Sequence, residues 1–261
     1  MDGNLVFSII IPARNEEAMI AGAVESALNA ASRFEARNGS SLHLHHASTE
    51  ILVVDNASTD GTAKILNGYI ERHGVRRIVS HRLKAPCARN DGAAQARGRI
   101  LIFMDADTRM SGDALSIIGS HVDCHGCDAG ITRLASLEGG IKAWCWWAFW
   151  GQVRRLPLAR AKAMPAFMFC TREVFDRFGP FDEEVAIGEE WPILGGVYRD
   201  RLRRLIYDRS LTARSSNRRM ALQRFGYVAN FAKYVWAVLH KRGRINYTDR
   251  YRHSLRERWE S

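Results

Sequence analysis

The chain has 261 residues, of which 46% are hydrophobic, 25% charged and 10% aromatic. This composition indicates a folded globular protein and excludes a disordered or collagen-like chain. The formal net charge of +10 at pH 7 predicts an anionic partner, which nucleic acid, a phosphorylated ligand or an acidic membrane surface would each provide.

The length and the cysteines bound the organisation of the chain. Because α/β domains often reach this size, we expect one domain over residues 1–220, followed by an amphipathic helix and a basic tail over residues 221–261. No stretch approaches the ~18 consecutive apolar residues that cross a bilayer, and residues 1–7 do not resemble a signal peptide. Five scattered cysteines favour reduced thiols over a disulfide framework. We therefore expect a cytoplasmic protein.

Strands and helices are predicted in alternation along the first part of the chain. Short apolar runs rich in β-branched residues predict buried strands at residues 5–11, 51–54 and 100–104. Apolar residues at helical spacing predict helices at residues 16–31 and 62–71. This order predicts an α/β fold with a parallel sheet and right-handed crossovers. Ligands of such sheets bind at the carboxyl ends of the strands.

Acidic side chains follow these strands. Asp105 and Asp107 come directly after the third strand, and two carboxylates so close favour a bound divalent cation, for which Mg²⁺ or Mn²⁺ is suited. Asp55 and Asn56 follow the second strand and bring another acid to the same edge. Each group also has a purely structural interpretation. The Asp-x-Asp pair would end a strand and cap a helix, and Asp55 would belong to a turn.

Four ordered motifs resemble those of family 2 glycosyltransferases with the GT-A fold. They are SIIIPARNEE at residues 8–17, ILVVDNASTDGT at 51–62, ARNDGAAQARGRILIFMDADT at 88–108 and FMFCTREVFDRFGPFDEEVAIGEEW at 167–191. The resemblance implies a Rossmann-like, mixed but mainly parallel sheet flanked by helices. It also implies a hexosyltransferase-type enzyme that moves a sugar with inversion from a nucleotide diphosphate sugar, a UDP sugar first, using Mn²⁺ or Mg²⁺. The acceptor would be a hydroxyl of a saccharide or lipid-linked molecule.

The resemblance assigns roles on the donor side. The nucleoside would contact the first loop and the end of the second strand, through Pro12, Arg14, Glu16 and Asp55. The base and diphosphate side would be lined by Lys84, Arg89 and Asn90.

The same resemblance places the metal and a closing loop. Asp107 would ligate the metal that bridges the two phosphates, with Asp105 beside it at the sugar and ribose. Arg218 lies in a basic stretch, residues 212–219, where family members carry a flexible loop that closes over the diphosphate. A solvated run of charges is the alternative interpretation of this stretch.

Two adjacent acids are candidates for the general base of an inverting transfer. Inversion needs a carboxylate that takes the proton of the acceptor hydroxyl, with a pKa raised toward neutrality. The family usually has Glu-Asp at this point and uses the second acid, which nominates Glu190. Since glutamate is one methylene longer than aspartate, Glu189 remains the alternative base. An acidic first turn of the following helix is the structural interpretation of both residues.

An aromatic segment follows in the middle of the chain. Four tryptophans, at positions 144, 146, 147 and 150, precede Arg154 and Arg155. Tryptophan favours the headgroup region of a bilayer and cations attract anionic lipid, so peripheral contact with an anionic membrane is one hypothesis. A packed core helix and a sugar-stacking wall are the alternatives.

Other segments carry weaker signals. A helix is predicted over residues 171–182, ending near Gly179, and an amphipathic helix over residues 227–239. Residues 33–49 are predicted to form a polar loop before the second strand. The cluster HVDCHGC at residues 121–127 has zinc-binding residue types, but without a second ligand pair it is weak evidence for a metal site.

Two other classes of function are less consistent with the sequence than a nonprocessive glycosyltransferase. A nucleotidyltransferase would need a glycine-rich basic signature after the first strand, and PARNEE is not one. A nucleic-acid-binding module is supported only by the net charge, and acids at the strand ends would repel a phosphate backbone. We therefore do not expect nucleic acid as a partner.

Overall fold

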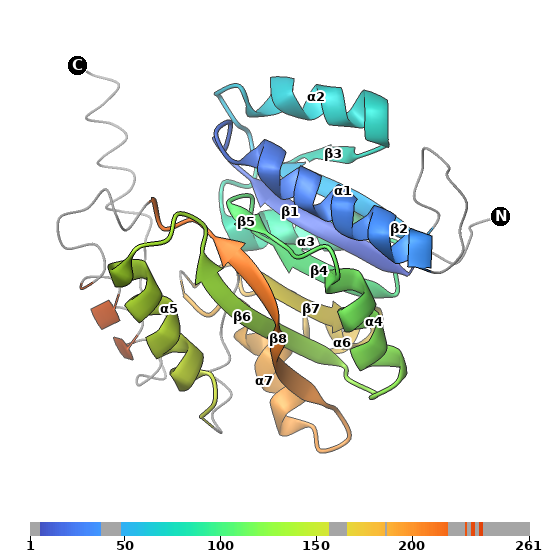
Figure 1. Cartoon of the computed structure of the whole chain (residues 1–261). Coiled ribbons are helices and arrows are strands. Elements are labelled where there is room, and N and C mark those ends of the chain that lie inside the picture. Colours follow the sequence, from blue (N-terminus) through green and yellow to red (C-terminus); the bar gives the residue numbers. More distant parts are fainter. Residues whose placement is uncertain are drawn as a thin grey trace.

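An eight-stranded sheet with the strand order β3-β2-β1-β4-β7-β6-β8-β5 forms the centre of the protein (Figure 1). The computed structural model describes residues 6–37, 48–156, 166–185 and 187–218, with residues 228, 231–232 and 235–236. The strands are β1 Phe7–Ala13, β2 Thr49–Asp55, β3 Arg76–Val79, β4 Ile100–Met104, β5 Thr108–Arg109, β6 Ala129–Ser136, β7 Phe167–Thr171 and β8 Leu205–Ser215. The helices are α1 Ile20–Arg37, α2 Thr62–His73, α3 Ala85–Gln95, α4 Ala114–Asp123, α5 Ile141–Val153, α6 Arg172–Phe178 and α7 Trp191–Arg199.

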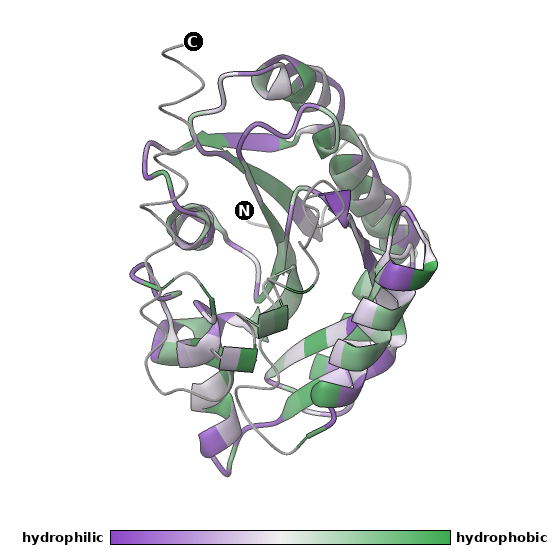
Figure 2. Cartoon of the chain, turned by 90° about the vertical axis from the view of Figure 1, so that its left-hand side faces the viewer, coloured by the Kyte–Doolittle hydropathy of each residue, from purple (hydrophilic) through white to green (hydrophobic). Residues whose placement is uncertain are grey.

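The first half of the sheet is parallel, as predicted. β1 pairs with β2 and with β4, and β2 pairs with β3, all in parallel. Helices cover both faces of this sheet. Successive side chains of β1 point to opposite faces, so α3 and α4 contact different residues of the same strand. A Cβ on Gly92 of α3 would meet Ile10 at 2.5 Å, whereas one on Gly119 of α4 would meet Phe7 at 3.4 Å. Figure 2 shows the hydrophobic colouring of the central strands between these helices.

The boundaries of the predicted elements differ from the structure by a few residues. β4 has the predicted bounds, while β1 lies two residues later than expected and α2 is two residues longer. α1 begins at Ile20 and continues to Arg37, so part of the predicted polar loop is helical. The extra turn is stabilised by Phe34, whose ring packs edge-on against Phe7 with centroids 5.0 Å apart.

The second half of the sheet contains the antiparallel strands. β7 pairs antiparallel with both β4 and β6, and β6 pairs parallel with β8. β7 is followed at once by α6, which is shorter than the predicted helix, and the hydroxyl of Thr171 accepts a hydrogen bond from the Val174 amide at its start. The mixed, mainly parallel α/β class expected from the resemblance is confirmed.

The C-terminal expectations fall mostly outside the described residues. The predicted helix over residues 227–239 is described only at five positions, and the tail beyond residue 236 lies outside the description. None of the helices in the described part of the chain is long and apolar enough to span a bilayer.

Candidate active site

The loops after β1 and β2 are fastened to each other at the carboxyl edge of the sheet. Asn15 has a left-handed backbone with φ 53°, and its carboxamide oxygen accepts a hydrogen bond from the Thr59 amide at 2.8 Å. The amide of Glu16 donates to the Thr62 hydroxyl at 2.9 Å. These bonds hold residues 12–16 beside the end of β2, where Pro12 is half-buried and Arg14 exposed.

Asp55 lies at this edge with both carboxylate oxygens engaged. Its side chain is buried, and one oxygen accepts a hydrogen bond from the Ser58 amide at 3.0 Å. The other oxygen accepts from Arg77 Nε at 3.0 Å. Arg77 was not predicted from the sequence; it lies on β3 two residues from Val79, the register partner of Asp55. Arg77 and Asp55 therefore form an ion pair at the end of β2.

Lys84 and Asn90 both bond to the segment that follows α6. Lys84 Nζ donates to the Glu183 carbonyl at 2.8 Å. Asn90 Nδ2 donates to the Phe181 carbonyl at 3.0 Å, and Asn90 Oδ1 accepts from the Phe181 amide at 2.9 Å. Both residues therefore anchor the segment that follows α6 to α3.

Arg89 is the centre of the acidic cluster. It projects from α3, is 2% exposed, and donates to Asp105 at 2.5 Å and to Glu189 at 3.0 Å. Burial opposes the charge of Arg89, but Asp105 and Glu189 together raise its pKa above the ordinary value. One guanidinium thus joins the end of β4 to the loop before α7.

Glu190 is the most deeply buried acid of the cluster. It is fully buried, and neither of its carboxylate oxygens has a hydrogen-bond partner among the described residues. Burial, followed by the neighbouring Glu189, raises the pKa of Glu190 to about 8. Burial also raises the pKa of Glu189, although Arg89 opposes that shift. Glu190 has the environment expected of a carboxylate tuned to accept a proton near neutral pH.

The turn that places both glutamates depends on a glycine. Gly188 has φ 86°, and a Cβ there would lie 2.4 Å from the ring of Trp191. The Trp191 amide donates to the Gly188 carbonyl at 3.0 Å, which begins α7 directly after Glu190. Both glutamates therefore precede α7, whose first turn has no acidic residue, so their interpretation as an acidic first helical turn is wrong.

Asp105 and Asp107 are the carboxylates that the sequence nominated as metal ligands. The side chain of Asp105 is 31% exposed, and Asp107 is half-buried with its carbonyl accepting from the Ser216 amide at 3.0 Å. Within the described ranges, no group of three or more His, Cys, Asp or Glu residues is arranged to hold a metal. A site with one or two carboxylates suits Mg²⁺ or Mn²⁺, which complete their coordination with waters and phosphate oxygens.

The basic stretch after β8 reaches the first loop. Residues up to 215 belong to β8, so the flexible loop predicted over residues 212–219 is a strand in its first half. Arg218 forms an ion pair with the buried Glu16. Two residues assigned to the donor side, far apart in sequence, are thereby brought together across the carboxyl edge of the sheet.

A sequence model described as Glycosyl transferase family 2 matches residues 8–172, which is more than half of the chain. The chain belongs to this family. Two curated proteins similar to the chain are a dolichyl-phosphate beta-glucosyltransferase of Drosophila melanogaster and the glycosyltransferase AglE of Haloferax volcanii. The first is 30% identical over 40% of the chain and 31% of the relative. The second is 28% identical over 69% of the chain and 57% of the relative. The chain thus covers less than two thirds of either relative.

Solved structures share the fold of this chain. A mannosyltransferase of Pyrobaculum calidifontis matches with a TM-score of 0.61 at 19% identity, covering 89% of the chain and 61% of that protein. The glucosyl-3-phosphoglycerate synthase of Mycobacterium tuberculosis matches with a TM-score of 0.60 at 18% identity, covering 94% and 85%. The GT-A fold expected from the motifs is confirmed by these likenesses.

The HVDCHGC cluster at residues 121–127 contains the residue types of a zinc site. In the HVDCHGC cluster, His121 Nε2 bonds Asp208 at 2.8 Å and Cys127 is a buried thiol. His121 thereby ties α4 to β8, and no group of three or more His, Cys, Asp or Glu in the described part of the chain is arranged to hold a metal.

The tryptophans of α5 divide between two surroundings. Trp150 is buried, and Trp147 Nε1 donates to Asn217 at 3.1 Å. Trp144 is 67% exposed. One face of α5 is therefore the packed helix considered as an alternative, and the other faces outward. Arg154, expected among the outward cations, is buried instead.

Proposed function

We propose that this family 2 chain is a nonprocessive, inverting glycosyltransferase. Its donor is a nucleotide diphosphate sugar, a UDP sugar first, and its acceptor is a hydroxyl group. The observation that carries the proposal is the junction of Asp105, Arg89 and the Glu189–Glu190 pair at the carboxyl edge of the sheet. Two structures with this fold are described as complexes with GDP-Man and Mn²⁺ and with Mn²⁺ and UDP-glucose, which supports the donor class.

Glu190 is the general base of this proposal. As the acceptor oxygen attacks the anomeric carbon, its proton passes to a Glu190 carboxylate oxygen, and the bond from that carbon to the diphosphate breaks. The raised pKa of about 8 matches a base that works near neutral pH. Because neither oxygen is exposed to solvent, acceptor binding has to open a path to it. Glu189 is the alternative base, although its carboxylate already accepts a hydrogen bond from Arg89.

The donor would lie between the loops that the structure has fastened together. Pro12, Arg14, Asp55 and Arg77 form the nucleoside side of this proposal. The first three lie at the ends of β1 and β2, and Arg77 reaches Asp55 from β3. Arg218 would turn from Glu16 to the diphosphate, where a positive charge stabilises the leaving group.

Asp107, with Asp105 beside it, would hold Mn²⁺ or Mg²⁺ against the two phosphates. When bound, the ion supplies electrostatic stabilisation of the departing nucleoside diphosphate. Arg89 has a separate role. It compensates the charge of Asp105 and Glu189 in a buried site where two carboxylates would otherwise repel each other.

A thermal-shift panel tests the donor and metal parts of the proposal. UDP, GDP, CDP and dTDP are each added with and without Mn²⁺ to the wild-type protein and to Asp107→Ala. Ligand at about 100 times its dissociation constant adds about 2.7 kcal/mol of stability, which raises the melting temperature by several degrees. We expect an Mn²⁺-dependent shift with one nucleotide that is lost in the variant. A shift that does not depend on Mn²⁺, or is unchanged in Asp107→Ala, would refute the metal assignment.

A further inference from the structure

The charge of this protein is concentrated in two segments. Residues 139–172 and 209–248 together hold 15 of the 38 Lys and Arg residues and none of the 28 Asp and Glu residues. The remainder of the chain has 23 basic against 28 acidic residues, a net charge of −5. The excess positive charge of the whole molecule therefore comes from these two segments alone.

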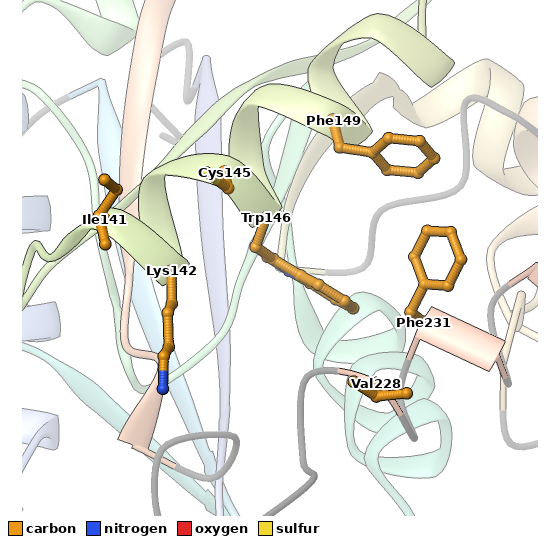
Figure 3. A pocket seen from close by; sticks show the side chains of 7 residues that line it. All are labelled: Ile141, Lys142, Cys145, Trp146, Phe149, Val228 and Phe231. Carbon is orange, nitrogen blue, oxygen red and sulfur yellow. The ribbon is translucent and has the colours of Figure 1, made fainter.

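The two segments meet at the outer face of α5. An apolar pocket of about 440 Å³ is lined by Ile141, Lys142, Cys145, Trp146 and Phe149 of α5 and by Val228 and Phe231 of the second segment (Figure 3). The rings of Phe149 and Phe231 pack with centroids 5.1 Å apart. In Figure 3 the aromatic side chains point toward one another, while the ammonium group of Lys142 points away from them.

Large apolar side chains on this face remain open to solvent. Ile141 is 79% exposed and Trp144 is 67% exposed. Phe149, Leu156 and Val228 are also exposed, whereas another face of α5 packs on the hydrophobic core through Trp147. An exposed apolar group of this kind marks a contact surface. Lys142 and Arg155 are exposed beside it.

We propose that the outer face of α5 docks on the surface of an anionic lipid bilayer. Indole rings favour the headgroup region, the aliphatic side chains enter the acyl boundary, and the cations bind lipid phosphates. The absence of acidic residues in both segments removes the repulsion that would oppose such a surface. A nucleic acid would use the cations but would leave the aliphatic side chains and the apolar pocket without a partner, so the bilayer is the better match. This docking is independent of the transfer reaction proposed above.

Vesicle sedimentation with the full-length protein tests the docking directly. Vesicles of phosphatidylcholine alone are compared with vesicles containing about one third phosphatidylglycerol, in low salt and in about 0.5 M NaCl. We expect binding to the anionic vesicles, at least about tenfold weaker binding to the neutral ones, and a strong loss in high salt. Equal binding to both vesicle types, or none to the anionic vesicles in low salt, would overturn the proposal.

Matched variants show whether α5 is the surface involved. Ile141→Ser with Trp144→Ser should weaken binding at least about tenfold, whereas Leu202→Ser, at an 89% exposed position on the turn after α7, should not change it. Lys142→Glu should weaken binding by a similar factor, and Lys64→Glu on the exposed side of α2 should have little effect. Equal effects of the α5 variants and their controls would assign binding to net charge alone and reject the site.

A third measurement separates a bilayer from nucleic acid. A single-stranded oligonucleotide is titrated under the same salt conditions. Tighter binding to the oligonucleotide than to anionic vesicles, unaffected by the Ile141 and Trp144 substitutions, would overturn the proposal in favour of a nucleic-acid surface. Since none of these assays contains a sugar donor, their failure would leave the transferase proposal intact, and loss of turnover would leave the docking result intact.

Discussion

Replacing Glu190 by glutamine should make the protein more stable at alkaline pH while removing its activity. Glu190 is fully buried, and burial together with Glu189 raises its pKa from 4.5 to about 8. At about 1.4 kcal/mol for each pKa unit, that shift corresponds to about 5 kcal/mol between the two protonation states. Glutamine keeps the shape of the side chain and removes the ionisation.

The direction of the pH dependence of stability is set by whether the folded or the unfolded state holds the Glu190 proton. Between pH 4.5 and 8 the unfolded chain releases the Glu190 proton and the folded protein retains it. The free energy of unfolding of the wild type therefore falls as the pH rises through this window, and the fall is complete above the folded pKa. Glu190→Gln lacks this contribution. We expect the two proteins to unfold at similar denaturant concentrations at pH 5, and the variant to be more stable by several kcal/mol at pH 9.

Urea unfolding followed by circular dichroism at pH 5 and pH 9 measures this difference. Glu71→Gln, on the exposed side of α2, is the matched control and should follow the wild type at both pH values. A stability gap between Glu190→Gln and the wild type that does not widen with pH would refute the buried ionisation. Turnover measured in parallel should fall by orders of magnitude with donor binding retained. If Glu189→Gln is the inactive variant instead, Glu189 is the base.

Three further predictions concern the same cluster. Arg89→Met should destabilise the protein by about 3–5 kcal/mol in urea unfolding, because it leaves Asp105 and Glu189 without their buried cation; a loss below about 1 kcal/mol would contradict this. Gly188→Ala should cost at least about 2 kcal/mol, since it places a Cβ at positive φ against Trp191. Gly68→Ala, in α2 with open space around it, is its control and should gain about 0.5–1 kcal/mol. The kcat/KM of the wild type should rise with pH up to the Glu190 pKa of about 8, and a flat profile across neutral pH would exclude Glu190 as the base.

The sequence predicted what is local and missed what depends on distant pairing. β4 was located at both ends because an apolar run of five residues stops at Asp105. The position of the acids at the strand ends followed from the parallel order of β1, β2 and β4. The contact of Arg89 with Glu189 joins residues 100 positions apart, and it depends on β7 entering the sheet antiparallel, which no local pattern announces. Arg77 was missed for a similar reason, since its role depends on the register of β3 against β2.

The aromatic segment shows a second limit of sequence reasoning. Tryptophan content alone did not separate a core helix from a surface helix, and α5 is both. The position of each tryptophan around the helix axis decides whether it is buried. Trp144 and Trp150 lie on different faces of α5, and their exposed fractions are 67% and 7%. Arg154 illustrates the same point, since a basic residue in a cationic run is buried.

The contacts of the short helix α3 limit which segments can be exchanged between family members in a chimera. Lys84, which directly precedes α3, and Arg89 and Asn90 within it bond to the chain between residues 181 and 189. These three residues hold the loop that carries the two glutamates. The loop that carries the proposed general base therefore cannot be exchanged independently of α3. A chimera that takes residues 181–191 from another family member should fold and work only when it also takes the partners at positions 84, 89 and 90.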